Sequence, residues 1–251
     1  MSEMLSFAPR GDGEGLAVTG CCEGATHLLV PARVNGVPVT AVAEEAFMGN
    51  TALREVIFEA PDEDMILNLL AVDDIGMSAF RGCTSLVRVV IPSDGGVSVG
   101  HGAFSGCTAL QEATLGNSVC LSACAFYECE SLTALSPLLY VGDSALEGCT
   151  SLTRVTLVPG ASEIGDDAFR GCDLLTEIRF PASMKHIGQD AFRSCPSLSR
   201  AEFEAPDGWY WECAYYEGKQ PLDLSDPQRN AEVLRTMDFD DGVLWWRREK
   251  K

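Results

Sequence analysis

The sequence predicts an α/β repeat solenoid of about seven stacked units, with a cap at each end. Two observations support this prediction: a short phrase built on an Ala-Phe pair (Ala-Leu in one copy) recurs seven times, and alternating apolar residues follow each copy. A unit of about 23 residues is too short to bury its own apolar face, so neighbouring units must stack to complete a core. The copies begin at Ala46, Ala79, Ala103, Ala125, Ala145, Ala168 and Ala191, in steps of 33, 24, 22, 20, 23 and 23 residues.

Residues 1–45 precede the first copy and are expected to form an N-terminal cap with a lead-in segment. A cap is needed because the exposed end strand of a solenoid invites pairing with other chains. The first residues, MSEMLSFAPRGDGEG, contain neither the basic start nor the apolar run of a signal peptide. We therefore expect a cytoplasmic protein if Met1 is native, and a cell-surface or secreted one if a leader has been removed.

Within the repeats, which we place at residues 46–204, a mostly polar pair precedes each Ala-Phe phrase. In the sixth copy this pair is Asp166-Asp167, and we expect its carboxylates in the first turn of a short helix, where negative charge is favoured. A glycine near the end of the phrase predicts a left-handed residue there. Because Glu128 and Ser194 take its place in two copies, we do not expect that geometry to be obligatory. The glycines are Gly82, Gly106, Gly148 and Gly171.

Each phrase continues as L-x-x-apolar-x-apolar, for example at Leu175, Ile178 and Phe180. The last two apolar residues alternate as they do in a half-buried strand, so we expect one strand and one short helix or turn in each repeat. The second residue of the Ala-Phe pair is apolar in every copy. It is expected to form the repeat core, at Phe47, Phe80, Phe104, Phe126, Leu146, Phe169 and Phe192.

Cysteine recurs three residues after this core position, at Cys83, Cys107, Cys129, Cys149, Cys172 and Cys195. A catalytic residue is not normally copied once per unit, whereas a buried cysteine packs as a small apolar residue. Stacked strands about 4.8 Å apart would allow disulfides. The odd total of eleven cysteines and the lack of an export signal argue against them, so we expect free thiols with a structural role.

The long first step contains an insertion, PDEDMILNLLAVDD, at residues 61–74. Insertions of this kind form loops on one face of a solenoid and sometimes bind a partner; a longer strand or wider turn with no role in recognition is the alternative. We take Asp62, Glu63 and Asp64 as candidate partner-binding residues, together with Ile57 and Val90 on the strands beside the loop.

Two columns of side chains are expected to point outward from the strands. The first alternates in charge and should pair with itself across neighbouring strands: Glu55, Arg88, Glu112, Ala134, Arg154, Glu177 and Arg200. The second is apolar only at its N-terminal end, beside the insertion: Ile57, Val90, Thr114, Ser136, Thr156, Arg179 and Glu202. We expect this end to be the contact patch for a partner, unless the insertion covers it.

Residues 205–251 are expected to form a C-terminal cap with one helix and a short strand, VLWWRR. The helix would begin at a capping box of Ser225 and Gln228, or at Asp226 with Pro227 in the first helical position. We expect the four tryptophans, Trp209, Trp211, Trp245 and Trp246, to cover the last repeat. The alternative for these tryptophans is a ligand-binding aromatic cage.

Composition and motifs argue against several function classes. The chain has 18 Lys and Arg against 37 Asp and Glu, a net charge of −19, which disfavours nucleic acid. It lacks an apolar run long enough to insert in a membrane. The spacing of Cys120, Cys124 and Cys129 does not match a structural zinc site, and the three histidines accompany no recognised catalytic or cofactor motif. We therefore expect no catalytic residue, metal or cofactor.

The phrases IGDDAFRGCDLLTEIRFP and HIGQDAFRSCPSL resemble the BspA-like class of leucine-rich repeats, whose period of 20–29 residues these repeats share. LLVPARVNGVPVTAVAEEAF resembles that class's usual opening segment, and LDLSDPQRNAEVL its closing segment. The resemblance extends from about residue 15 to 246. It implies a curved solenoid and, in several secreted members, adhesion to host or matrix proteins.

These observations together predict a non-enzymatic protein-binding module that acts as a monomer. The alternatives are an adhesin-like cell-surface protein, a structural scaffold, and an enzyme subunit with a site in its caps. The identity of the partner lies beyond what the residues predict.

Overall fold

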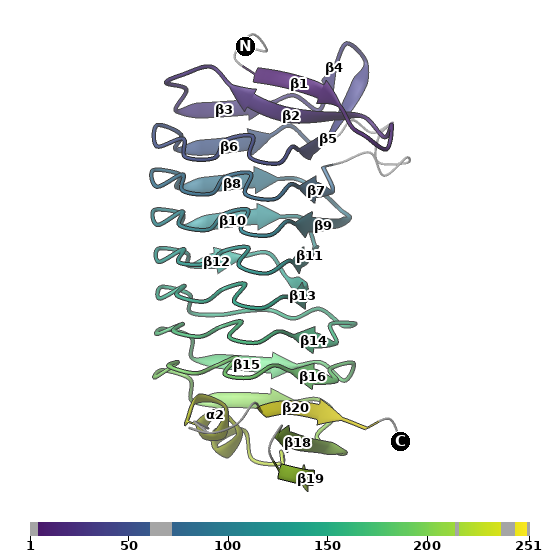
Figure 1. Cartoon of the computed structure of the whole chain (residues 1–251), viewed down its shortest axis with the longest axis vertical. Helices are drawn as coiled ribbons and strands as arrows, with labels where there is room; N and C mark the ends of the chain where they lie inside the picture. Colours follow the sequence, from purple (N-terminus) through teal and green to yellow (C-terminus); the bar gives the residue numbers. More distant parts are fainter. Residues whose placement is uncertain (1–4, 61–71, 214–215, 237–243, 250–251) are drawn as a thin grey trace.

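The computed structural model describes residues 5–60, 72–213, 216–236 and 244–249. The chain winds into a solenoid of about eight turns, and most turns contribute one strand to each of two sheets that face each other across a continuous core (Figure 1). The predicted repeat solenoid is therefore confirmed. It has one turn more than the seven phrase copies, because the lead-in segment forms a turn of its own from β2 and β3.

We call the larger sheet the long sheet. Its strands are, in spatial order, β1 (Leu5–Pro9), β2 (Leu16–Cys21), β5 (Val37–Val42), β7 (Asp74–Ile75), β9 (Gly96–Val99), β11 (Ser118–Leu121), β13 (Leu138–Val141), β14 (Glu163–Ile164), β16 (His186–Ile187), β20 (Leu244–Arg248), β18 (Trp209–Cys213) and β19 (Tyr216–Pro221), with β4 (Arg33–Val34) paired to β5.

We call the opposite face the repeat sheet, because the L-x-x-apolar-x-apolar segments form it. Its first part runs through β3 (His27–Val30), β6 (Glu55–Phe58), β8 (Arg88–Ile91), β10 (Glu112–Leu115) and β12 (Ala134–Leu135), and its second through β15 (Glu177–Phe180) and β17 (Arg200–Phe203). A single bridge between Arg154 and Glu177 extends the second part by one turn.

The Ala-Phe segment is a turn, which is one of the two forms expected for it, and not a short helix. Its amides alternate between two kinds of acceptor, which an α-helix does not allow. The Phe126 N–H donates to the Ala145 carbonyl of the next turn at 2.7 Å, whereas the Tyr127 N–H donates to the Cys124 carbonyl within its own turn at 3.0 Å. The expectation that carboxylates such as Asp166-Asp167 stabilise a helix N-terminus is therefore wrong. The sequence also misses the second strand of each repeat, formed at the Ile/Val-Gly step.

Left-handed geometry is obligatory in these turns, contrary to the expectation from Glu128 and Ser194. Both residues have φ of 57°, close to the 70–75° of the glycines at the same position in the other copies. The residue before each Ala-Phe pair is also left-handed, as at Asp167 with φ of 54°. A non-glycine residue in this conformation costs about 1–2 kcal/mol. Hydrogen bonds to the next turn hold it there: the Glu128 N–H donates to Glu147 at 2.8 Å.

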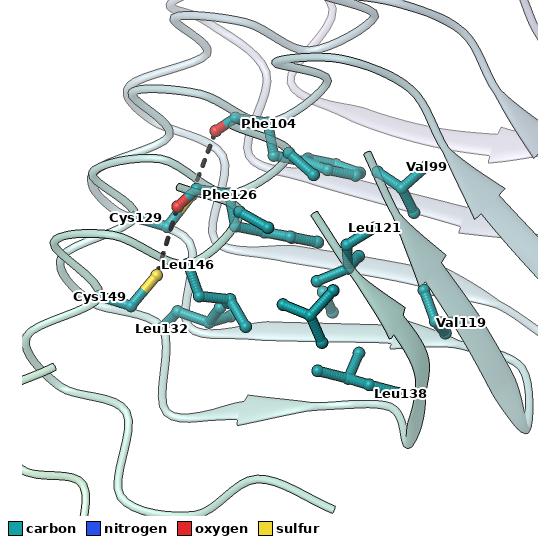
Figure 2. Close-up of a cluster of buried hydrophobic side chains, with 14 of the residues drawn as sticks. Val99, Phe104, Val119, Leu121, Phe126, Cys129, Leu132, Leu138, Leu146 and Cys149 are labelled. Carbon is teal, nitrogen blue, oxygen red and sulfur yellow. Dashed lines mark hydrogen bonds between the residues drawn. The ribbon is translucent and has the colours of Figure 1, made fainter. Parts of the chain in front are cut away.

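The core is a column of stacked rings that runs along the solenoid axis. Phe47, Phe80, Phe104 and Phe126 stack at centroid separations of 4.8–5.0 Å. Leu146 continues the column (Figure 2), and Phe169 and Phe192 stack at 5.1 Å. All seven side chains are at most 3% exposed. Successive turns therefore share one apolar interior rather than forming separate small cores.

The glycine of the Ile/Val-Gly step is required by the close approach of successive turns. A Cβ atom at Gly188 would lie 2.3 Å from the carbonyl carbon of Gly165 in the preceding turn, and one at Gly165 would lie 2.5 Å from the Asp143 nitrogen. Real Cβ atoms do not approach backbone atoms this closely. The step therefore marks a place where backbone packs directly on backbone.

The C-terminal cap closes both sheets. Helix α2 (Pro227–Thr236) packs on β17, and its buried Asn230 donates to the carbonyls of Ala201 and Leu224, each at 3.1 Å. Asp226 caps this helix by accepting the N–H groups of Gln228 and Arg229, so of the two predicted starts the structure has Asp226 followed by Pro227. Among the described residues α2 is the one helix, and no helix is long and apolar enough to cross a membrane.

The described tryptophan side chains cover the last turn. Trp209 is 3% exposed and Trp246 is 5% exposed, and both rings lie against Phe203 of β17. They therefore act as core residues and not as an open aromatic cage. The side chains of Trp211 and Trp245 lie outside what the structure describes.

We predict that Phe169→Ala lowers the free energy of unfolding by about 3–5 kcal/mol, because it empties a buried aromatic site. Denaturant melts measure this change. Leu174→Ala is the matched control in the same repeat: Leu174 is 49% exposed, and its loss should change stability by about 0.5 kcal/mol or less. A loss below about 1 kcal/mol for Phe169→Ala would contradict its place in the core.

We predict that Gly188→Ala destabilises the solenoid by about 1–3 kcal/mol or more, because the added methyl group must push two turns apart. Gly95→Ala is the control, since its Cβ would meet nothing closer than 3.7 Å and its φ is not left-handed. Thermal melts of the two variants give the comparison. Equal melting temperatures would show that the turns are not in direct backbone contact.

Candidate functional site

The six recurrent cysteines form a ladder that bonds each turn to the one before it; Figure 2 shows the bonds of Cys129 and Cys149. Each thiol donates to the backbone carbonyl of the core position of the preceding turn, with Sγ–O distances of 3.0–3.3 Å. The same carbonyl also accepts the backbone N–H of the residue three positions later in its own turn. For example, the Cys83 N–H donates to the Phe80 carbonyl at 3.0 Å. Both lone pairs of this buried carbonyl are thereby used.

These thiols are unsuited to nucleophilic chemistry. Burial raises the pKa of Cys83, Cys149 and Cys195 to about 12, and it raises the pKa of the other three in the same direction. A thiol must be deprotonated to attack, and it must be protonated to donate. The ladder cysteines are therefore hydrogen-bond donors of the core.

The first copy has Asn50 where the others have cysteine, and its side chain makes a different set of bonds. Its Oδ1 accepts the N–H groups of Ala52 and Leu53, each at 3.1 Å, and its amide group contacts Cys21 Sγ at 3.6 Å. Cys21 ends strand β2 of the additional first turn. This link could not be predicted from the sequence, because the lead-in segment carries no Ala-Phe phrase.

The remaining candidates for metal or acid–base chemistry do not converge. His27 lies on β3, His101 in the turn after β9 and His186 on β16. Burial and the nearby Arg247 lower the pKa of His186. Of the C-x₃-C-x₄-C residues, Cys129 is engaged in the ladder. In the part of the chain that the structure describes, no three His, Cys, Asp or Glu side chains are grouped to hold a metal ion.

The first outward column of the repeat sheet pairs with itself over most of its length. Arg88 lies between Glu55 and Glu112 in register and bonds both, at 3.5 and 3.2 Å. Arg154 pairs with Glu177 at 3.6 Å. Exposed pairs of this kind contribute little, about 0–1 kcal/mol each, but they leave few unpaired charges on the face.

Two details of the columns differ from the expectation. Arg200 bonds Glu202 of its own strand rather than Glu177 of the neighbouring one. Ser136, expected to point outward, is 9% exposed, and its Oγ accepts the Leu115 N–H at 2.7 Å. The reason is the shortness of β12: its pairing ends at Leu135, and the side chain of Ser136 supplies the next bond to β10.

The second outward column begins with three apolar side chains on adjacent strands. Ile57 pairs in register with Val90 on one side and with Leu29 of β3 on the other. Leu29 is 45% exposed, and Ile57 and Val90 are half-buried. We call these three residues the apolar patch. Leu29 was missed because β3 lies outside the seven phrases, although HLLV alternates as a strand does.

The rest of the second column is polar. Thr114 and Thr156 are exposed, and Arg179 pairs with Glu204 at 3.2 Å. The candidate residues Asp62, Glu63 and Asp64 lie outside the described residues. The second outward column therefore changes from apolar at β3–β8 to charged at β15–β17.

Comparison with known proteins gives a consistent match over the solenoid. The BspA type leucine-rich repeat region matches residues 40–137 and 120–206 in six copies. A leucine rich cell surface protein from Faecalibacterium prausnitzii A2-165 is 26% identical, with a TM-score of 0.66. The match covers 83% of this chain and 55% of that one, so this chain spans just over half of its length.

A second solved structure, the T. pallidum leucine rich repeat protein, is 25% identical with a TM-score of 0.55. This match covers 81% of this chain and 82% of that one. No curated protein matches the chain.

We predict that the ladder thiols are shielded from alkylation in the native protein. At pH 8 iodoacetamide should modify the exposed Cys22 and leave the six ladder cysteines unmodified, because they are buried and protonated. Thiol counting after denaturation of untreated protein should find close to eleven free thiols. Recovery of several ladder pairs as disulfides after anaerobic purification would overturn this assignment.

Proposed function

Because the chain belongs to the BspA-type leucine-rich repeat family, we propose that it is a non-enzymatic module that binds a protein partner on the outward surface of its repeat sheet. The observation that supports this proposal is the apolar patch of Leu29, Ile57 and Val90. Single apolar side chains on a surface are ordinary, but adjoining ones on three paired strands form a contact surface.

The surroundings of the patch suit a docking site. Glu55, Arg88 and Glu112 form a polar border along one side of it, and their charges are already paired with each other. A border of this type excludes water around an apolar centre and adds little affinity of its own. The net charge of −19 would speed association with a basic partner and slow association with an acidic one.

The alternatives have less support. An enzyme needs a base or nucleophile near the operating pH, whereas the ladder thiols are protonated and the three histidines lie on separate elements. A scaffold without a discrete binding surface would not require three apolar side chains on an otherwise polar face. The non-enzymatic binding role accounts for both observations.

A location at the cell surface is a second candidate, supported by the similarity to the F. prausnitzii cell surface protein. In that case the partner would be extracellular. Labelling of intact source cells with a membrane-impermeant biotin reagent tests this location. Recovery of labelled chain supports it, and labelling only after lysis contradicts it.

We predict that Ile57→Asp with Val90→Asp weakens partner binding by at least about 30-fold, which corresponds to the loss of about 2 kcal/mol from a buried apolar contact. Partners captured with the wild-type chain are identified first, and each is then titrated against the variants. The circular dichroism spectrum must be unchanged.

The matched control is Ala134→Asp with Thr156→Asp, which adds the same charge to the same face at least two strands from Val90. The control should retain every partner. If the Ile57/Val90 variant also retains every partner with unchanged affinity, the apolar patch is not the binding site.

A further inference from the structure

Each sheet has an edge strand at each end of the solenoid, and an edge strand can pair with another chain unless something covers it. One of these edge strands, β3, has no strand paired to its outer side in the described residues. At the C-terminal end β16 pairs with β20, and α2 covers β17. At the N-terminal end β2 pairs with β1; the pairing shifts register between Ser6 and Phe7, where Thr19 of β2 has no partner, and β1 ends at Pro9. Bulges and prolines blunt an edge. In the described ranges no strand pairs with the outer side of β3.

The hydrogen bonds to β6 show which backbone groups of β3 face outward. The Thr26 carbonyl accepts the N–H groups of Arg54 and Glu55, and the Val30 carbonyl accepts that of Glu59 at 2.9 Å. In a parallel pair alternate residues direct both groups to the same side. Thr26, Leu28 and Val30 therefore face β6, whereas the N–H and C=O groups of His27 and Leu29 face the free edge.

The shape of this end accepts one added strand and excludes a second solenoid. The long sheet continues past β2 to β1, but the repeat sheet stops at β3, level with β2 (Figure 1). This leaves a step one strand deep, about 4.8 Å. A second copy placed edge to edge on β3 would bring its own β2 to the level that β1 occupies. A single extended segment meets no such obstacle.

We propose that β3 is a docking edge, on which one extended segment of the partner adds to the repeat sheet as a further strand. This inference rests on the proposed function and names how that partner is held. The segment would bond the two N–H and two C=O groups of His27 and Leu29, a mode known as β-augmentation. Its outward side chain would lie beside Leu29 and extend the apolar patch.

The geometry of this edge determines which side chains the docked segment can carry. Its inward side chain continues the column of Leu28 and Val30, both at most 5% exposed, and must be apolar. Its outward side chain next to Leu29 is favoured when it is β-branched or apolar. Because the chain carries a net charge of −19, flanking lysine or arginine residues favour association. Pro31 follows β3 and limits the ladder to these few bonds.

Amide hydrogen exchange, followed residue by residue by NMR, tests whether the edge is free. In the protein alone the His27 and Leu29 amides should exchange rapidly, while those of Leu28 and Val30 should be protected. Slow exchange at His27 and Leu29 in dilute protein would show that the chain covers its own edge. Slow exchange only at high concentration, with a doubled mass, would show that a second copy occupies it. Either result overturns the proposal.

A second experiment repeats the hydrogen-exchange measurement in the presence of a synthetic peptide probe, Lys-Thr-Val-Thr-Val-Thr-Val-Lys. We expect millimolar probe to slow exchange at His27 and Leu29 by at least tenfold, and the same peptide methylated on every backbone nitrogen, so that neither edge can donate, to have no effect. No protection by the unmethylated probe overturns the proposal. Leu29→Pro removes the edge donor, and we expect it to abolish the protection at His27, since proline is tolerated where the N–H faces solvent.

Two variants separate this inference from the proposed function. Leu29→Thr keeps the edge N–H and removes the apolar side chain, so it should retain probe binding within about threefold. A captured partner that is lost from Ile57→Asp with Val90→Asp but binds Leu29→Pro normally would leave the proposed function intact and refute the docking edge. Unchanged protection of the Val56 amide confirms that each variant is folded.

Discussion

Backbone hydrogen bonds between successive turns are the constraint on which the rest of this structure depends. In the first six Ala-Phe turns the amide of the core residue donates to the next turn, as from Phe104 to Ala125 and from Phe169 to Ala191, at 2.8 Å in both cases. The amide of the left-handed residue two positions later does the same. These bonds hold turns of 20–33 residues in one register, and they set the spacing at which the phenylalanine rings stack.

That register explains features of the sequence that would otherwise suggest chemistry. Direct backbone contact leaves no room for a side chain at Gly165 or Gly188. It leaves the carbonyl of each core residue with one unused lone pair, which the cysteine of the next turn satisfies. A short side chain with a weak donor fits this position. The recurrent Asp-Ala-Phe and Gly-Cys pairs are therefore consequences of stacking and not parts of an active site.

The solenoid could be predicted from the sequence because each repeat carries the same apolar positions, and stacking them is the only way to bury them. The second strand of each turn could not, since Glu163–Ile164 and His186–Ile187 are two residues long and acquire strand character only by pairing with their neighbours. The left-handed state of Glu128 follows from its bond to Glu147 and leaves no trace in residue type.

The candidate site, like the fold, could be predicted from the sequence only in part. Ile57 and Val90 could be placed on one outward column from the phrase register, and the structure puts them on paired strands. Leu29 lies in the additional turn, where no phrase sets the register. A surface that repeats turn after turn offers little to distinguish one partner from another. It becomes distinctive at the N-terminal end, where the repeat pattern gives way to β3 and the neighbouring strand is absent from the described sheet.

Native-state hydrogen exchange of the turn amides tests the central claim most directly. If bonds between turns hold the solenoid together, the amides of Phe80, Phe104, Phe126 and Phe169 should exchange as slowly as those of the buried strand residues Val89 and Ala113. They should also respond to denaturant with the same slope, because opening a turn then requires separating it from its neighbour. Exchange of these amides at the rates of an exposed loop, with the strands still protected, would contradict the account.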